Sequence, residues 1–354
     1  MINSIITGTG CYIPTVKVPN QQFLVNEFYQ ADGTKIPKDV EDVVNKLREI
    51  TCIRERRYVT DDLTTSDMAY LAAKNALNGI DRESLDYIIV AQNLGDVKAE
   101  NNTPDMVPTI AARVKHKLRI KNPYTVAYDI PFGCPGWLQG MITADYYIKS
   151  GDAKKIMVIG AETLSRVSDP HDIDCMIYSD GAGATVLEAS ENGGGVLSHV
   201  TRSDTYDNAC LMTLGKSYGP SRNINELFIK MQGHDIYKYA VRTVPKVVKQ
   251  SLDKAGLTLS DVKKVLIHQA NQKMDEAILE RLFKLYQTDA IPENIMPMTI
   301  SWLGNSSVAT LPTMLDLVQK GKLENHNRLQ SGDIVVFASV GAGMNINSMV
   351  YKMQ

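Results

Sequence analysis

"DKAGLTLSDVKKVLIHQAN" at residues 253–271 and "ALNGIDRESLDYIIVAQN" at residues 76–93 decide the fold, because they repeat one pattern. Each reads as the end of a helix, a glycine stop, a short polar loop and an apolar strand. When Gly79 is aligned with Gly256, Ala91 falls on His268. The two stretches lie about half of the 354-residue chain apart. We therefore interpret them as the same part of two related halves.

Two further pairs of segments repeat in the same order. "FGCPGWLQGMITADYYIKSGD" (132–152) aligns with "LGNSSVATLPTMLDLVQKGK" (303–322), which places Cys134 on Asn305. "GDAKKIMVIGAE" (151–162) aligns with "GDIVVFASVGAG" (332–343), and in both a Gly-Asp turn leads into an apolar strand. Alternating helices and strands predict a mainly parallel sheet covered by helices. We expect an α/β fold of two layered halves, residues 1–190 and 191–354, related by a pseudo-twofold axis.

Composition and charge exclude several classes of protein. Hydrophobic residues make up 44% of the chain and charged residues 22%, which is typical of a globular protein. A net charge of -2 gives no footprint for nucleic acid. We expect no signal peptide and no membrane span, since no apolar run approaches the required length of about 20 residues. Five cysteines, an odd number, predict free thiols and a cytoplasmic location.

Cys134 lies between Gly133 and Pro135, just before a helical pattern. The first turn of a helix carries a partial positive charge, which predicts a lowered thiol pKa. Pro135 suits the first helical position. Each of the other cysteines (Cys11, Cys52, Cys175 and Cys210) is interpreted as a small buried hydrophobic residue.

His268 and Asn305 are the expected partners of Cys134. His268 ends an apolar strand, and ligands bind at the carboxyl ends of strands in α/β sheets. A lone histidine there is commonly structural, but the repeat brings all three residues toward the centre. Two chemistries fit. In a hydrolase the histidine activates the thiol. In a condensing enzyme the histidine and the amide both donate to an enolate.

Glycine-rich and acidic segments complete the list of candidates. The turn Gly341-Ala342-Gly343 is either an ordinary tight turn or part of an oxyanion hole, with the N–H groups of Ala342 and Cys134 as donors. "SDGAGATVLEA" (179–189) is interpreted as packing between the halves. "HDIDC" (171–175) lacks metal-ligand spacing, and no segment matches a phosphate-binding glycine motif. We therefore expect no metal and no cofactor.

With these residues in hand, the chain resembles the β-ketoacyl-acyl carrier protein synthase III family of the thiolase superfamily. The similar segments are "CIRERR" (52–57), "GCPGWLQG" (133–140), "SDGAGA" (179–184), "HQANQKM" (268–274) and "GNSS" (304–307). Plant-type polyketide synthases share the Cys, His and Asn but lack the HQAN context. They remain an alternative, as does a Cys-His-Asn thioester hydrolase. A catalytically silent paralogue is disfavoured, because all three residues are present.

The resemblance implies a thiolase-like fold in a layered αβαβα arrangement and a ping-pong reaction. Cys134 would take an acyl group from acyl-CoA or acyl-carrier protein. A malonyl thioester would then lose carbon dioxide and attack that group to give a β-ketoacyl thioester, while His268 and Asn305 hold the enolate. The resemblance implies fatty-acid initiation or the synthesis of a specialised lipid.

It also implies a homodimer, in which Val107 reaches into the partner's pocket. Head-to-head condensing relatives have a glutamate there, so valine argues against that branch. The tryptophan and arginine that clasp the adenine of coenzyme A in acetyl-CoA users are replaced by Lys46 and Ile50.

Basic residues indicate where a carrier protein would bind. Lys273 follows the HQAN motif at the place where family members have a basic residue that contacts carrier protein. Arg242, Lys246 and Lys249 recur at helical spacing. Such a stripe is either a solvated face or a patch that steers an acidic partner. We expect acyl-carrier protein to be preferred over coenzyme A for malonate delivery.

Overall fold

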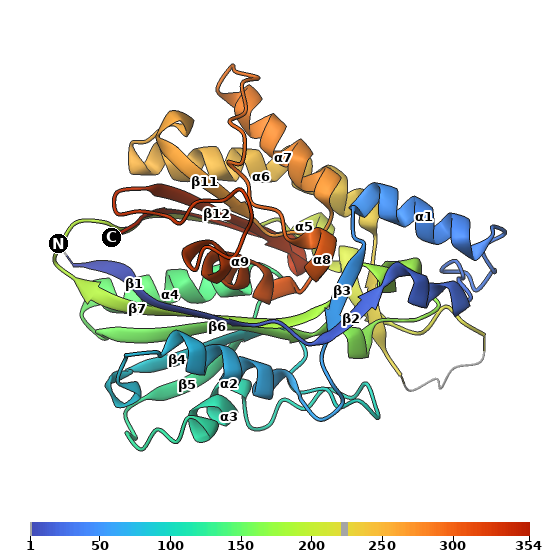
Figure 1. Ribbon diagram of the computed structural model, residues 1–354, viewed down its shortest axis with the longest axis horizontal. Coiled ribbons are helices and arrows are strands. Elements are labelled where there is room, and N and C mark those ends of the chain that lie inside the picture. The colour runs from blue at the N-terminus through green and yellow to red at the C-terminus, as the bar shows by residue number, and fades with distance from the viewer. Residues whose placement is uncertain (1, 221–225) are drawn as a thin grey trace.

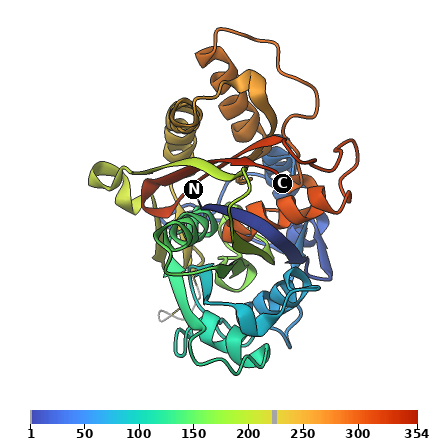
Figure 2. The ribbon, with the colours of Figure 1, turned by 90° about the vertical axis from the view of Figure 1, so that its left-hand side faces the viewer.

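The computed structural model describes residues 2–220 and 226–354, and its main body is layered in the order helix, sheet, helix, sheet, helix (Figure 1). A view turned by 90° shows the same stacking, with the two sheets on either side of a central pair of helices (Figure 2). The expected layered α/β arrangement is therefore confirmed.

The first sheet has the strand order β1-β7-β6-β4-β5. Its strands are β1 (Asn3–Tyr12), β7 (Asp180–Ser190), β6 (Lys155–Thr163), β4 (Tyr87–Gln92) and β5 (Val126–Pro131). Strand β4 is parallel to β5 and β6, whereas β7 runs antiparallel to both β6 and β1. The central strands read as unbroken apolar runs because helices cover both faces of the sheet.

The second sheet repeats this plan in the order β11-β12-β13-β8. Its strands are β11 (Val262–Ile267), β12 (Ile334–Gly341), β13 (Asn345–Lys352) and β8 (Gly195–Ser203). Strands β11 and β12 are parallel, and β13 runs antiparallel to its neighbours β12 and β8. The last strand of the first sheet ends at Ser190 and β8 begins at Gly195. The proposed division at residues 190 and 191 stays a prediction.

The helices form the remaining layers. The first sheet is covered by α2 (Thr65–Ala76) and α3 (Ile110–Lys117), and the second by α6 (Gly233–Ala255) and α7 (Gln272–Leu285). Helices α4 (Gly136–Ser150) and α9 (Thr310–Gln319) lie side by side between the sheets (Figure 1). Trp137 of α4, Met314 of α9 and Phe337 of β12 share one buried core there. Burial of such side chains contributes about 25 cal/mol per Å² of apolar surface.

The remaining helices and strands surround the layers. They are α1 (Val40–Thr51), β2 (Val16–Pro19), β3 (Glu55–Tyr58), α5 (Thr205–Asn208), α8 (Ile300–Leu303), β9 (Met212–Gly215) and β10 (Phe228–Met231). In the part of the chain that the structure describes, no helix is both long enough and apolar enough to cross a membrane.

The repeat predicted from the sequence is present in the elements. Helix α2 leads through a 3-10 turn into β4, and α6 leads through the equivalent turn into β11. Helices α4 and α9, and strands β6 and β12, also correspond. The "SDGAGA" segment packs between the halves as interpreted. A Cβ on Gly183 of β7 would lie 2.7 Å from Pro312 and Thr313 of α9.

Candidate active site

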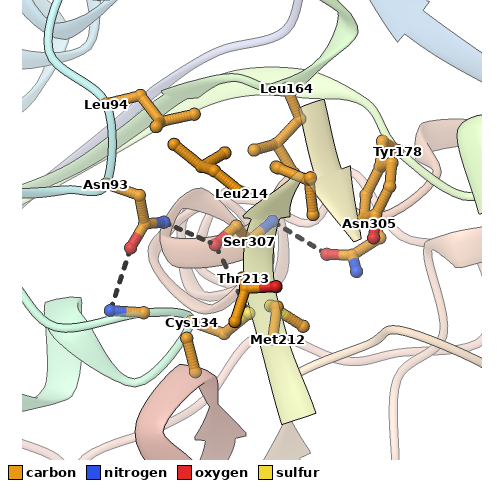
Figure 3. Close-up of a pocket in the computed structure, with 13 residues that line it drawn as sticks. Asn93, Leu94, Cys134, Leu164, Tyr178, Met212, Thr213, Leu214, Asn305 and Ser307 are labelled. Atoms are coloured by element: carbon orange, nitrogen blue, oxygen red, sulfur yellow. Dashed lines mark hydrogen bonds between the residues drawn. The ribbon is translucent and has the colours of Figure 1, made fainter. Parts of the chain in front are cut away.

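A pocket opens where the two halves meet (Figure 3). Its polar lining comes from both halves: Asn93 and Cys134 from the first, and Asn305 and Ser307 from the second. Its apolar lining includes Leu94, Leu164, Met212, Leu214 and Ile229. A few polar groups at one end of an apolar cavity are typical of a site for a ligand with an apolar tail.

Cys134 lies in the turn between β5 and α4. Gly133 adopts φ +66°, a left-handed conformation that glycine tolerates, and this turn brings the thiol into the pocket. Helix α4 begins at Gly136 with Pro135 as its N-cap. The expectation that Pro135 occupies the first helical position is therefore wrong by one residue, and Cys134 lies just outside the helix.

Asn305 lies in the equivalent turn of the second half. Gly304 has φ +71°, and the Asn305 backbone pairs with Tyr178 as an isolated parallel bridge. A 3-10 turn (Ser307–Ala309) precedes α9, which begins at Thr310. Asn305 is therefore not directly at a helix start, contrary to the expectation from the sequence.

Ser307 connects the two turns. Its hydroxyl donates to the Cys134 Sγ at 3.4 Å, and its backbone N–H donates to the Asn305 Oδ1 at 2.8 Å (Figure 3). The Asn305 oxygen is thereby occupied, so its NH₂ group is left as the donor for a ligand. Ser307 also has a left-handed φ of +51°. This role of Ser307 was not predicted from the sequence, although the residue stands in the "GNSS" segment.

Asn93 and Glu162 extend this network beneath the pocket. The Asn93 Oδ1 accepts from the Gly133 N–H at 2.9 Å, and its Nδ2 donates to Ser307 Oγ at 3.2 Å. The same Nδ2 donates to Glu162, which is fully buried. Burial raises the pKa of Glu162 to about 8. Both residues were missed, but Asn93 has a sequence signal: it follows β4 directly, as "HQAN" follows β11.

His268 lies at the carboxyl end of β11, as expected, and is 2% exposed. Among the described residues neither ring nitrogen has a hydrogen-bond partner, and the side chain does not line the pocket. Burial lowers the pKa of His268 to about 4, so the imidazole is neutral near pH 7. A neutral imidazole offers one N–H donor and one acceptor.

Gln269 connects the histidine strand to the asparagine turn. Its Oε1 accepts from the backbone N–H groups of Thr299 and Ile300, at 2.8 and 3.0 Å. These residues begin α8, which leads directly into Gly304. The "HQ" pair of the motif therefore combines a candidate site residue with a structural one.

Ala342 lines the pocket beside Cys134, as the oxyanion-hole hypothesis requires. A Cβ on Gly133 would lie 2.8 Å from the Ala342 nitrogen, and one on Gly341 would lie 2.6 Å from the Cys134 nitrogen. The two backbones can approach this closely because both positions are glycine. The roles of both N–H groups remain predictions.

The expected lowering of the Cys134 pKa is wrong. Burial, together with the nearby Glu162 carboxyl, raises the pKa of this thiol to about 11, and the hydrogen bond from Ser307 lowers it less. Cys134 lies one residue before the N-cap Pro135, outside the helix, and burial is the largest influence on its pKa. In the free protein Cys134 is a thiol, and a proton must leave it during acylation.

Known proteins of similar sequence and fold place the chain in a family. Models for 3-oxoacyl-(acyl-carrier-protein) synthase III and its C-terminal part match residues 128–205 and 252–353. The β-ketoacyl-(acyl-carrier-protein) synthase III of Xanthomonas campestris pv. campestris is 32% identical, over 99% of this chain and 98% of that protein. The chain belongs to the 3-oxoacyl-(acyl-carrier-protein) synthase III family.

Solved structures agree with this assignment to the synthase III family. The 3-oxoacyl-(acyl-carrier-protein) synthase III of Aquifex aeolicus VF5 superimposes with a TM-score of 0.80 at 28% identity, covering 99% of both chains. A priming β-ketosynthase from the R1128 polyketide pathway, at 23% identity, shares the fold with a TM-score of 0.81, covering 99% of this chain and 96% of that one. The thiolase-like fold predicted from the sequence is thus confirmed.

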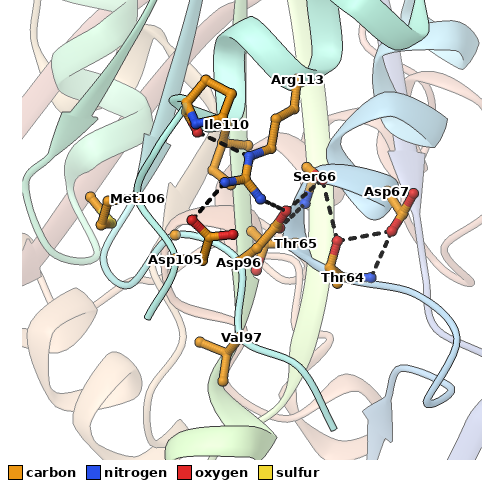
Figure 4. A network of polar contacts seen from close by, with 12 residues as sticks. Thr64, Thr65, Ser66, Asp67, Asp96, Val97, Asp105, Met106, Ile110 and Arg113 are labelled. Carbon is orange, nitrogen blue, oxygen red and sulfur yellow. Dashed lines mark hydrogen bonds and ion pairs between the residues drawn. The ribbon is translucent and has the colours of Figure 1, made fainter. Parts of the chain in front are cut away.

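In this synthase III chain, Arg113 holds the loop that carries Val107 through ion pairs and hydrogen bonds (Figure 4). The Arg113 guanidinium forms ion pairs with Asp96 and Asp105 at 2.6 and 2.8 Å, and donates to the carbonyls of Val107 and Pro108. Val107 itself is 83% exposed. The side chain therefore stands on an ordered loop, in a position open to a partner.

The basic residues of this synthase III chain do not form one compact patch. Lys273 lies in the first turn of α7 and is exposed. Arg242 and Lys246, in the middle of α6, are also exposed. Lys249 pairs with Asp253 at 2.8 Å and lies over the Tyr286 ring at the far end of α7. Along a helix of that length the separation from Lys273 is about 20 Å.

Lys46 and Ile50, the positions that the resemblance assigned to the adenine clasp, are open to solvent. Lys46 pairs with Glu49 at 3.2 Å, and Ile50 is 38% exposed. Nearby, Arg48 and Arg54 line a surface hollow that also includes Gln272, the neighbour of Lys273. Positive charge therefore lies beside Gln272, next to Lys273 in the chain, although no carrier-binding role was predicted for Arg48 or Arg54 from the sequence.

The remaining cysteines are free, as predicted. Cys175 is buried and Cys11 and Cys52 are partly buried, but Cys210 is exposed, which contradicts its interpretation as a buried hydrophobic residue. Within residues 2–220 and 226–354, no group of three or more His, Cys, Asp or Glu side chains is arranged to hold a metal ion.

Proposed function

We propose that this chain is an acyltransferase that joins a Cys134-bound acyl group to a malonyl thioester by decarboxylative Claisen condensation. The observation that carries the proposal is the position of Cys134 and Asn305, from opposite halves, in one pocket and linked through Ser307. The reaction serves fatty-acid initiation or the synthesis of a specialised lipid.

In the first step the Cys134 sulfur attacks the carbonyl carbon of an acyl thioester. The bond to the donor's sulfur breaks, and the donor leaves as a thiol with the proton that Cys134 gives up. The N–H groups of Cys134 and Ala342 stabilise the oxyanion, and one such donor typically contributes about 100- to 1000-fold in rate. Ser307 assists by donating to the sulfur as negative charge develops there.

In the second step a malonyl thioester loses carbon dioxide, and the electron pair of the broken bond forms an enolate. The Asn305 NH₂ and one N–H of neutral His268 donate to the enolate oxygen. The enolate carbon then attacks the acyl carbon, and Cys134 leaves as a thiolate that regains a proton. The product is a β-ketoacyl thioester.

A Cys-His-Asn hydrolase remains the alternative. It needs a histidine that takes the thiol proton, and burial lowers the pKa of His268 to about 4, which makes it a weak base. The thiol's hydrogen-bond partner is the hydroxyl of Ser307. Both observations favour condensation.

The partners follow from the same chemistry. Acyl-carrier protein delivers malonate beside Lys273, with Arg48 and Arg54 adding positive charge. Two copies of the chain form a homodimer, in which the exposed Val107 of each enters the partner's pocket. No metal or redox cofactor takes part, since the steps transfer an acyl group, release carbon dioxide and form a carbon–carbon bond without net oxidation or reduction. Free cysteines suit a cytoplasmic location.

Intact-mass analysis tests the proposal. The protein is incubated with a panel of acyl-CoA and acyl-carrier protein donors, followed by malonyl-carrier protein. One acyl adduct is expected on wild-type protein, none on Cys134→Ala, and conversion of the adduct to a β-ketoacyl product when malonate is added. Release of free acid without any condensation product would overturn the proposal in favour of the hydrolase.

A further inference from the structure

One wall of the pocket belongs to neither large sheet. Strands β9 and β10 form a separate hairpin, in which Ile229 pairs with Leu214 and Lys230 with Thr213. Met212, Leu214 and Ile229 line the pocket. An isolated two-stranded hairpin is only marginally stable in water. The position of this wall therefore depends on what holds the hairpin to the rest of the protein.

Lys230 attaches the hairpin to the rest of the protein through a buried ion-pair cluster. Successive side chains of a strand point to opposite faces, so Lys230 points away from the pocket that Ile229 lines. Its Nζ lies 2.6 Å from Asp169 and 3.1 Å from Asp172, and 3.3 Å from the centre of the Tyr218 ring. The Lys230 side chain is 9% exposed and that of Asp169 is fully buried.

Asp169 also holds the chain that follows β9. It accepts from the Ser217 hydroxyl and from the Tyr218 backbone N–H, each at 2.7 Å. The hydrogen bonds from Ser217, Tyr218 and Lys230 lower the pKa of Asp169, which keeps it ionised. The buried Asp169 carboxylate thus binds the segment that follows β9, through Ser217 and Tyr218, and also β10, through Lys230. Removal of one partner from a buried ion pair leaves an uncompensated charge and is strongly unfavourable.

We propose that Lys230 is a positioning residue that holds the β9–β10 wall against the pocket through Asp169 and Asp172, and so sets the acyl chain length that reaches Cys134. This inference rests on the proposed function for its substrate class. The β9–β10 wall is also a physical barrier near the Cys134 thiol. Its position can therefore be probed by chemical modification of that thiol, without any enzymatic reaction.

The test combines two readouts on Lys230→Met. The first is kcat/KM for acylation of Cys134 by acyl thioesters of two to twelve carbons. The second is the ratio of modification rates at Cys134 by octyl and by methyl methanethiosulfonate, read by peptide mass mapping. Lys230→Arg, which retains the charge, is the rescue variant.

A control removes a lysine–aspartate pair elsewhere, one whose aspartate is equally buried but whose lysine is more exposed. Lys320 pairs at 2.7 Å with Asp316, whose side chain is 1% exposed, and neither residue lines the pocket. Lys320→Met therefore removes the lysine partner of a buried aspartate but leaves the contacts of the β9–β10 wall unchanged. If Lys230→Met fails to fold, Asp172→Asn replaces it, because that variant keeps the closer pair with Asp169.

Lys230→Met is expected to shift the long-to-short acylation ratio and the octyl-to-methyl modification ratio toward long chains by tenfold or more. Lys230→Arg and Lys320→Met should stay within about twofold of wild type. Unchanged ratios in both assays would overturn the inference. If wild-type protein accepts no acyl group but the octyl-to-methyl ratio still shifts, the positioning role holds and the proposed function fails.

Discussion

The two glycine turns at the centre of the molecule begin alike and end differently. Gly133 and Gly304 both adopt left-handed φ angles and each precedes a candidate site residue. After Cys134 the chain enters the long helix α4 at once. After Asn305 it makes a 3-10 turn before α9. That extra turn places Ser307 between the amide of its own half and the thiol of the other.

This difference shows how one duplicated scaffold can serve two chemical tasks. In the proposed mechanism the first turn presents the nucleophile Cys134 and its backbone N–H. The second presents an amide donor and a hydroxyl that reaches across to the nucleophile. If that division is correct, changes at His268 and Asn305 should spare acylation and damage condensation, whereas a change at Ser307 should act on the thiol.

The largest effect is expected from His268→Ala and Asn305→Ala. Both variants should still be acylated at Cys134, but condensation should fall by about 100- to 1000-fold, because each loses one donor to the enolate. Single-turnover acylation measured beside product formation separates the two steps. Loss of acylation in His268→Ala would place that residue with the nucleophile and break the comparison.

Ser307→Ala should have a smaller effect, and on acylation. The Ser307 hydroxyl lowers the pKa of Cys134, so its removal should raise that pKa and slow acylation near pH 7 by about 3- to 10-fold. The pH–rate profile of acylation should move to higher pH. Ser306→Ala is the matched control, since the Ser306 hydroxyl bonds Thr310 rather than the thiol. Equal effects in both serine variants would contradict the bridging role.

Glu162→Gln should alter stability in a pH-dependent manner. The folded-state pKa is raised to about 8 from 4.5, so between these values the unfolded chain ionises before the folded one, and wild-type stability falls as pH rises. The glutamine variant lacks this loss. Its Tm should match that of wild type near pH 4.5 and exceed it by a few degrees at pH 8. Glu188→Gln, at a partly exposed site, is the control. A Tm difference that does not grow with pH would argue against a buried acid beneath the nucleophile.

The smallest effect is expected at the entrance. Lys273→Glu should lower kcat/KM for malonyl-carrier protein by about 3- to 10-fold at low salt, and the loss should shrink as salt is added. Turnover of a small malonyl thioester should stay nearly unchanged. Equal losses with both donors would assign Lys273 to the chemistry or the fold instead.

The sequence predicted the duplicated layers because apolar periodicity and glycine stops are local signals. It also selected Cys134, Asn305 and Ala342, which the structure places in one pocket. Those local signals do not indicate how deeply a side chain is buried in the folded protein. The raised pKa of Cys134 and the fully buried Glu162 depend on packing between segments far apart in the chain.

The same limit explains the other misses. Asn93 and Ser307 meet across the interface between the halves, and no local pattern predicts that hydrogen bond. The anchoring of Lys230 to Asp169 joins residues 61 positions apart. Helix starts were predicted one to five residues too early at both turns, because a glycine marks a turn without fixing where helical geometry begins.

The close approach of Gly341 to the Cys134 nitrogen, and of Gly133 to that of Ala342, has a consequence for the newly made chain. A ribosome completes the nucleophile's half long before residue 341 emerges. Until then the thiol lacks Ser307, Asn305 and the Ala342 backbone, and it has only half of a pocket. In the proposed mechanism, reactivity therefore begins when the last strands of the protein dock, and a truncated chain would carry the cysteine without the groups that act on its substrate.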